Sequence, residues 1–201
     1  MEVTDKQIEE YQKIHKKEHG EDISREDAIE SINNLIGFFS VLLKIDRKDK
    51  ERQHRLKKEP KGFHIEGVGY SCCICGFNIS NEETWYDKNG IKCLICQKAL
   101  DKKLIPALVC RNKDSWYSIH ELDYYFNIKS ATVRRLIRQG KLKARIVPSE
   151  NKKPYFYILL IKDNIGVLPN KPKGYSVKDK DGLCHTEYEK VDISKLLELI
   201  G

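Results

Sequence analysis

Residues 72–96 read CCICGFNISNEETWYDKNGIKCLIC, and this stretch decides the expected fold of the central part of the chain. It contains two Cys-x-x-Cys steps with seventeen residues between them. Gly76 follows the first step, where a tight turn needs a small residue. Two-residue spacing lets both thiolates of a step reach one metal ion at ~2.3 Å, and four thiolates satisfy tetrahedral zinc. The spacing therefore predicts a metal site with the ligands Cys72, Cys75, Cys93 and Cys96.

The segment between the two steps predicts a β-hairpin, because Lys88-Asn89-Gly90 suits a tight turn, and the chain after Cys93 has helical composition. This order of knuckle, hairpin and Cys-x-x-Cys at a helix start resembles a treble-clef zinc finger, within residues 63–111. The resemblance implies one structural Zn²⁺ per chain, since four protein thiolates leave no open position for water. Treble clefs that are nucleases need histidines, and residues 75–110 contain none.

The other three cysteines leave alternatives open. Cys73 could replace Cys72 as a ligand if the register of the first step slips by one residue. Cys110 and Cys184 are interpreted as small buried hydrophobic side chains. Disulfides are not expected, because the N-terminus lacks the pattern of a signal peptide and the chain is predicted to be cytoplasmic. An iron–sulfur cluster and a thiol redox pair are the remaining alternatives for the four-cysteine set.

Positive charge is concentrated in one segment. The chain has a net charge of +7, from 37 basic and 30 acidic residues. Residues 129–145 contain no acidic residue, so this segment alone equals the whole excess and predicts a local anion-binding surface. Its seven basic residues are Lys129, Arg134, Arg135, Arg138, Lys141, Lys143 and Arg145.

Two short helices joined by a turn at Asn127 are predicted around this segment. Ser118 and Glu121 form a capping box for the first helix, and Ser130 is expected to cap the second, which ends at Gly140. Arginine pairs bidentately with guanine or phosphate, and no Glu or Asp interrupts the basic stripe of the second helix. At 100° per residue, the inner face holds Val133, Leu136 and Ile137 and the outer face Ala131, Arg134, Arg135 and Arg138.

Residues 141–147 and 155–161 predict two strands, so that helix, turn, helix and hairpin form a winged helix-turn-helix. Residues 116–147, which end in RRLIRQGKLKAR, resemble the DNA-binding domains of MerR-like regulators and phage excisionases. Neither inducer sensing nor recombination control follows, because this chain has a zinc module upstream and no long effector coil downstream. The resemblance implies double-stranded DNA as partner, with major-groove contacts from Ser130, Thr132, Arg134, Arg135 and Arg138, and backbone or minor-groove contacts from Lys143, Arg145, Lys152 and Lys153.

Both ends of the chain predict helices. Thr4 and Gln7 make a capping box in a helical region that covers residues 1–60. The apolar face within residues 24–43 is too broad for a solitary helix, so it packs in the chain's own helical hairpin or forms a homodimer or docking surface. Residues 44–61 extend the helix or act as a linker. The C-terminal part predicts a hairpin at Asp181-Gly182 and a helix capped by Asp192, with Leu196, Leu197 and Ile200 as its apolar side.

The expected fold class is α+β, in four parts: a helical region (1–60), a zinc module (63–111), a winged helix-turn-helix (115–162) and a C-terminal hairpin and helix (163–201). No run of ~18 apolar residues is evident, so no membrane partner is expected and the protein is predicted to be cytoplasmic, associated with the nucleoid if bacterial.

The expected function is that of a zinc-containing DNA-binding protein, either a transcriptional regulator or a mobile-element accessory factor. The alternatives are an adaptor subunit of a larger nucleic-acid-processing complex and an RNA binder. An enzyme is not expected, because the sequence offers no nucleophile–base arrangement, phosphate-cradling glycine loop or open metal site.

Overall fold

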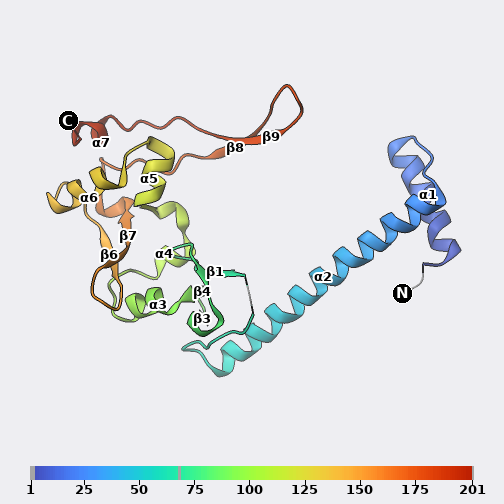
Figure 1. The fold of residues 1–201 in the computed structure, drawn as a ribbon, viewed down its shortest axis with the longest axis horizontal. Helices are drawn as coiled ribbons and strands as arrows, with labels where there is room; N and C mark the ends of the chain where they lie inside the picture. The colour runs from blue at the N-terminus through green and yellow to red at the C-terminus, as the bar shows by residue number, and fades with distance from the viewer. Residues whose placement is uncertain (1–2, 68, 201) are drawn as a thin grey trace. The chain divides into compact units, whose positions relative to one another are not determined.

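The protein is seen in a computed structural model that describes residues 3–67 and 69–200 (Figure 1). The chain divides into two compact units, residues 1–59 and residues 60–201. The first is helical and the second mixes short helices with antiparallel strands, so the expected α+β class is confirmed. The predicted zinc module, helix-turn-helix and C-terminal part all lie in the second unit.

The first unit consists of α1 (Asp5–His19) and α2 (Arg25–Lys58). The capping box of Thr4 and Gln7 is confirmed, and Gly20 ends α1 in the left-handed conformation at φ 77°. The Ser24 side chain accepts a hydrogen bond from the Asp27 backbone and starts α2. Figure 1 shows α1 crossing the N-terminal part of α2. Residues 44–58 continue α2 and are not a linker.

The middle of α2 exposes large apolar side chains, including Phe38, Phe39 and Leu43. Only Ala28 of α2 is buried, so packing within the chain's own hairpin does not account for the apolar face. One 18-residue window of α2 has a mean hydropathy of 1.4, so the helix is long and apolar enough to cross a membrane by length and composition. Length and composition alone do not make α2 a membrane span, and the location of the protein stays a prediction.

The second unit begins with the cysteine-rich segment. The strands pair as two antiparallel hairpins, β1 with β2 and β3 with β4. The elements are β1 (Tyr70–Ser71), β2 (Asn78–Ile79), β3 (Thr84–Asp87), β4 (Gly90–Cys93), α3 (Leu94–Asp101) and α4 (Leu108–Arg111).

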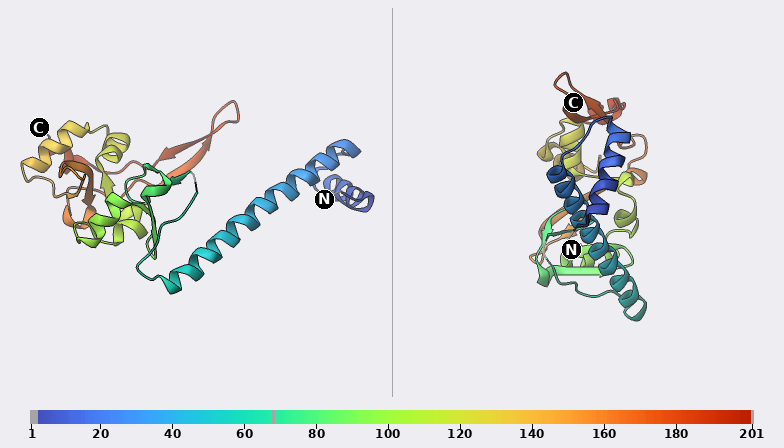
Figure 2. Two further views of the ribbon diagram at one scale, coloured as in Figure 1. Left: turned by 60° about the horizontal axis from the view of Figure 1, so that its bottom comes forward. Right: turned by 90° about the vertical axis from the view of Figure 1, so that its right-hand side faces the viewer.

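The remainder of the second unit holds two short helices joined by a turn, the sheet beside them and the C-terminal segment. Figure 2 shows its last hairpin as an arm that extends from the rest of the unit. The elements are β5 (Trp116–Ser118), α5 (Ile119–Phe126), α6 (Ser130–Arg138), β6 (Arg145–Pro148), β7 (Pro154–Leu160), β8 (Gly174–Lys178), β9 (Cys184–Tyr188) and α7 (Ser194–Glu198).

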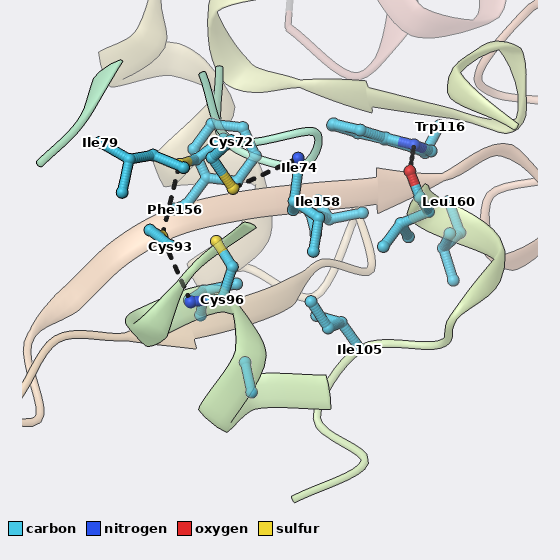
Figure 3. Close-up of a cluster of buried hydrophobic side chains, with 14 residues drawn as sticks. Cys72, Ile74, Ile79, Cys93, Cys96, Ile105, Trp116, Phe156, Ile158 and Leu160 are labelled. Atoms are coloured by element: carbon cyan, nitrogen blue, oxygen red, sulfur yellow. Dashed lines mark hydrogen bonds between the residues drawn. The ribbon is translucent and has the colours of Figure 1, made fainter. Parts of the chain in front are cut away.

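A three-stranded antiparallel sheet in the order β5-β7-β6 organises the second unit. Successive side chains of a strand point to opposite faces, and β7 follows this rule. Phe156, Ile158 and Leu160 join a buried cluster with the cysteines, as Figure 3 shows. Leu159 joins a second cluster, formed with residues of α5, α6 and α7. The sheet therefore joins the cysteine module on one face to the helix pair on the other.

Several local predictions can be compared with this structure. The capping box of Ser118 and Glu121 is confirmed, and Asn127 ends α5 in the left-handed conformation at φ 54°. Ser130 does not cap α6: Lys129 occupies the cap position, and Ser130 is the first helical residue. The prediction that Cys184 is buried is wrong, because β9 lies on an exposed hairpin without a core of its own.

Candidate metal centre and nucleic-acid interface

Three neighbouring elements bring four cysteines together. Cys72 and Cys75 lie in the turn between β1 and β2, Cys93 ends β4, and Cys96 lies in the first turn of α3. Their Sγ atoms all lie within 4.8 Å of one another, and all four residues are buried. Figure 3 shows Cys72, Cys93 and Cys96 beside Ile79 and Phe156. The group could hold a metal ion.

Backbone amides point at these sulfur atoms. The Ile74 amide donates to Cys72 Sγ at 3.4 Å, and the Cys96 amide donates to Cys93 Sγ at 3.4 Å. Hydrogen bonds from Cys75, Cys93 and Cys96 lower the pKa of the Cys72 thiol, since a donor favours the charged form of its acceptor. A thiolate in such a setting is the form that binds a metal ion.

The structure separates Cys73 from the cluster. Its Sγ donates to the Asn89 carbonyl at 3.7 Å, while Cys72 occupies the position among the four buried sulfurs. The fold thus places Cys72, and not Cys73, in the group of four that could hold a metal ion. Cys110 is half-buried and packs at the edge of the same apolar cluster.

Tyr155 is a residue of this site that sequence reasoning missed. Its hydroxyl lies 3.8 Å from Cys75 Sγ, although the two residues are 80 positions apart in the chain. Burial is the main cause that raises the pKa of the Tyr155 phenol, and the hydrogen bond with Cys75 raises this pKa further. Tyr155 belongs to β7, so this contact ties the cysteine cluster to the hairpin β6–β7.

The second candidate site is the outer face of α6. Val133 and Leu136 are buried, whereas Arg134, Arg135 and Arg138 are exposed, as the helical periodicity predicts. Ser130 and Thr132 lie at the sides of the helix and are half-buried.

Three of the predicted DNA-contacting side chains have partners within the chain. The Arg134 guanidinium lies 5.9 Å from the centre of the Tyr157 ring. Arg135 donates to the Ile200 carbonyl at 3.1 Å, beside α7. Arg145 forms an ion pair with Asp163 at 2.9 Å, on a separate part of the surface.

The other predicted basic side chains are exposed and, within residues 3–67 and 69–200, have neither a side-chain hydrogen bond nor an ion pair. An unpaired, solvated cation can contact a phosphate without first breaking an ion pair. Lys152 and Lys153 lie in the loop between β6 and β7, and Lys143 lies before β6 beside Arg145. The side chains in this group are Arg138, Lys143, Lys152 and Lys153.

A groove of about 320 Å³ lies between α6, the start of α5 and β7. Arg134 of α6 and Lys153 of the β6–β7 loop both line this groove, so two predicted contact residues border one hollow of the surface. Its aromatic and histidine side chains were not among the predicted site residues, because nothing in the local pattern brings β7 next to α6. The lining residues are Ile119, His120, Arg134, Lys153, Pro154, Tyr155, Phe156 and Tyr157.

Comparisons of the chain with protein-family models, curated proteins and solved structures found no match. The function is therefore argued from the two sites themselves. The name "basic surface" is used below for Arg134, Arg135, Arg138, Lys152 and Lys153.

Proposed function

We propose that this protein binds double-stranded DNA through the basic surface, and that a zinc ion held by the four cysteines stabilises the unit that carries this surface. The observation that carries the proposal is the charge of α6 and its surroundings. Residues 129–145 hold seven basic side chains and no acidic one, and the three arginines of α6 are all exposed. Phosphate contacts of such cations supply much of the affinity of DNA-binding proteins.

The shape of the surface supports DNA as the partner. The arrangement of β5, α5, α6, β6 and β7 fits a winged helix-turn-helix, in which the second helix enters the major groove. Val133 and Leu136 hold α6 against the unit by its inner face, which leaves its arginines on the outer face, toward a groove ~12 Å wide. The loop that carries Lys152 and Lys153 would then lie against the phosphate backbone.

Arg138 is the arginine best suited to contact DNA. It is exposed and has no partner among the described residues, whereas Arg134 stacks near Tyr157 and Arg135 bonds to a backbone carbonyl. Arg134 lines the groove with Lys153, where the two cations could hold one phosphate.

Zinc is the metal that fits the cysteine cluster best. Four thiolates in a buried set leave no coordination position for water or substrate, so the ion would be structural. The knuckle, hairpin and helix that carry the ligands fit a treble clef. Because the four cysteines would fill every coordination position of the zinc ion, we assign the ion no catalytic role.

A direct binding assay tests the DNA proposal. Fluorescence anisotropy with a labelled duplex is expected to show that Arg138→Ala lowers affinity by roughly 5- to 150-fold if Arg138 reads a base, corresponding to ~1–3 kcal/mol. Lys180→Ala, which removes an exposed cation from the β8–β9 hairpin, is the matched control and should leave affinity nearly unchanged. Equal effects of the two substitutions would contradict the proposal. Tighter binding to single-stranded or double-stranded RNA would favour the RNA alternative.

The metal is tested by its stoichiometry. Elemental analysis of protein purified without added zinc is expected to give one zinc per chain. A Cys72→Ser variant should lose the metal, whereas Cys73→Ser should keep it, because Cys73 lies outside the cluster. A zinc content far below one per chain in the unaltered protein would contradict the assignment.

An adaptor function is the second candidate, and one observation favours it. The apolar face of α2 is exposed over several turns, as in helices that bind another protein. A protein that binds no nucleic acid at low salt but co-purifies with a stoichiometric protein partner would support this function instead.

A further inference from the structure

The middle of α2 is the largest feature that the DNA proposal leaves unexplained. Seven large apolar side chains along it are between 42% and 66% exposed. The rings of Phe38 and Phe39 are both more than half exposed and lie edge to face, with centroids 5.8 Å apart. The residues are Leu35, Phe38, Phe39, Val41, Leu42, Leu43 and Ile45. A soluble protein seldom exposes a contiguous apolar patch of this kind unless it binds something.

Most of these residues share one face of the helix. At 100° per residue, Phe38, Leu42, Leu35, Phe39 and Leu43 fall in that order within an arc of roughly 140°. The opposite side of the same turns carries Asn33, Ser40 and Lys44. The stretch is therefore amphipathic, and a partner would cover one side only.

Charge on the two sides of the apolar stretch is opposite in sign. Residues 2–34 contain ten acidic and five basic side chains, a net charge of −5. Residues 44–58 contain three acidic and eight basic side chains, a net charge of +5. Residues 35–43 contain no charged side chain. Part of the negative charge lies before α2, and residues 25–34 of α2 themselves hold three acidic and one basic side chain. The charge of the first unit therefore changes sign across the apolar stretch, near Phe39.

We propose that two copies of this chain pair through the apolar face of α2 in antiparallel orientation, so that the acidic end of each copy lies beside the basic end of the other. An isologous two-fold contact of this kind buries the same patch on both chains. At each end of the dimer, the acidic part of one copy then lies beside the basic part of the other. A parallel pair would instead place acidic beside acidic and basic beside basic. The proposal does not depend on DNA binding.

A lipid bilayer fits the same observations less well. A membrane span needs ~20 predominantly apolar residues, and the polar side of α2 would place Asn33, Ser40 and Lys44 in lipid. A helix lying on an anionic membrane surface needs basic residues along its polar side. Here the net negative charge of residues 2–34 would be repelled while residues 44–58 are attracted.

Sedimentation equilibrium of the full chain tests whether it dimerises. Leu42→Glu places a carboxylate in the proposed contact, and Ser40→Glu places the same group on the opposite side of the helix. Both positions are exposed, so neither substitution disturbs the packing of the chain itself. We expect a dimer whose dissociation constant rises at least about tenfold in Leu42→Glu and changes little in Ser40→Glu. A monomeric native protein, or equal effects of the two variants, would overturn the proposal.

The orientation is tested by distances between spin labels introduced at one position per chain through an unnatural amino acid. In the antiparallel dimer centred near Phe39, labels at Ser40 are offset from each other along the helix by only about 3 Å. Labels at Lys50 are separated along the helix by about 33 Å, from a rise of ~1.5 Å per residue. Equal label separations at the two positions would establish a parallel pair and overturn the proposal.

The membrane alternative is tested with vesicles of phosphatidylcholine and phosphatidylglycerol. The dimer proposal predicts that the native protein stays in the supernatant when the vesicles are sedimented. Vesicle binding that Leu42→Glu abolishes, in a protein that is monomeric without lipid, would assign the face to a bilayer instead.

Discussion

At the scale of single residues, one buried ion pair supports the cysteine cluster. Lys92 is fully buried, and its Nζ lies 2.5 Å from Asp87 Oδ1 and 2.9 Å from the Gly90 carbonyl. The Asn89 amide also donates to Asp87 Oδ1, at 2.7 Å. These bonds close the β3–β4 hairpin, which ends at Cys93. The pair therefore helps to place one of the four sulfur atoms.

Lys92→Met is expected to lower the free energy of unfolding by about 3–5 kcal/mol, because it leaves the buried Asp87 carboxylate without its counter-charge. Chemical denaturation measures the change. Lys88→Met, an exposed lysine on the same hairpin, should stay within about 0.5 kcal/mol of the native protein. Adding Asp87→Asn to Lys92→Met should recover most of the loss. If Lys92→Met alone were as stable as the native protein, the pair would have no such role.

The same pair explains one limit of sequence reasoning. Lysine is rarely buried, so the sequence alone gives no reason to place Lys92 in the core. Its partner Asp87 comes within reach only when the hairpin closes and Asp87 pairs with Gly90. Capping boxes such as Ser118 with Glu121 were predictable, since both partners lie within one turn. The contacts of Tyr155 with Cys75 and of Arg135 with Ile200 were not, because they join residues 80 and 65 positions apart.

At the scale of elements, short segments owe their structure to their neighbours. The strand β5 has only three residues and was not predicted; it pairs with β7 from Trp116↔Leu160 to Ser118↔Ile158. The hairpin β3–β4 and the helix α3, in contrast, were predictable from local signals, the turn at Asn89-Gly90 and the helical composition after Cys93. The helix α7 was predicted, but its position beside α6 was not. Its Leu196 is fully buried, whereas Leu197 is half-exposed.

Leu196→Ala is expected to destabilise the second unit by about 2–5 kcal/mol, because it leaves a cavity in the cluster formed with α5 and α6. Leu197→Ala removes the same atoms from a side chain that is 50% exposed and should cost less than about 0.5 kcal/mol. Thermal or chemical unfolding of the two variants checks the difference. Similar losses in both would mean that α7 does not pack as described.

At the scale of the whole molecule, the cysteine cluster and the helix pair that carries the basic surface pack on opposite faces of one sheet. The cysteines belong to the same buried cluster as Phe156 and Ile158 of β7, and the other face of β7 packs on the helix pair. Neither cluster contains a residue of the first unit. The sequence predicted these parts as separate modules, because no local pattern indicates that side chains of β7 pack into both buried clusters.

Removal of the metal by a chelator is therefore expected to unfold the second unit as a whole and to spare α1 and α2. Near-ultraviolet circular dichroism of the buried Trp116 and DNA affinity should be lost together, while much of the helical far-ultraviolet signal remains. Cys184→Ser, which alters an exposed cysteine, should respond to the chelator like the native protein. Full DNA binding in metal-free protein would contradict a stabilising role for the metal.

The salt dependence of DNA affinity tests the central claim most directly. Log affinity falls linearly with log salt concentration, and each phosphate contact contributes about 0.9 to the magnitude of this slope for duplex DNA. Replacing Arg138, Lys152 and Lys153 together by alanine should reduce the slope by up to about 2.7 if each contacts a phosphate. The same change at Lys173, Lys178 and Lys180, around the β8–β9 hairpin, should leave it unaltered. A slope that falls equally in both triple variants, or in neither, would contradict DNA binding through the basic surface.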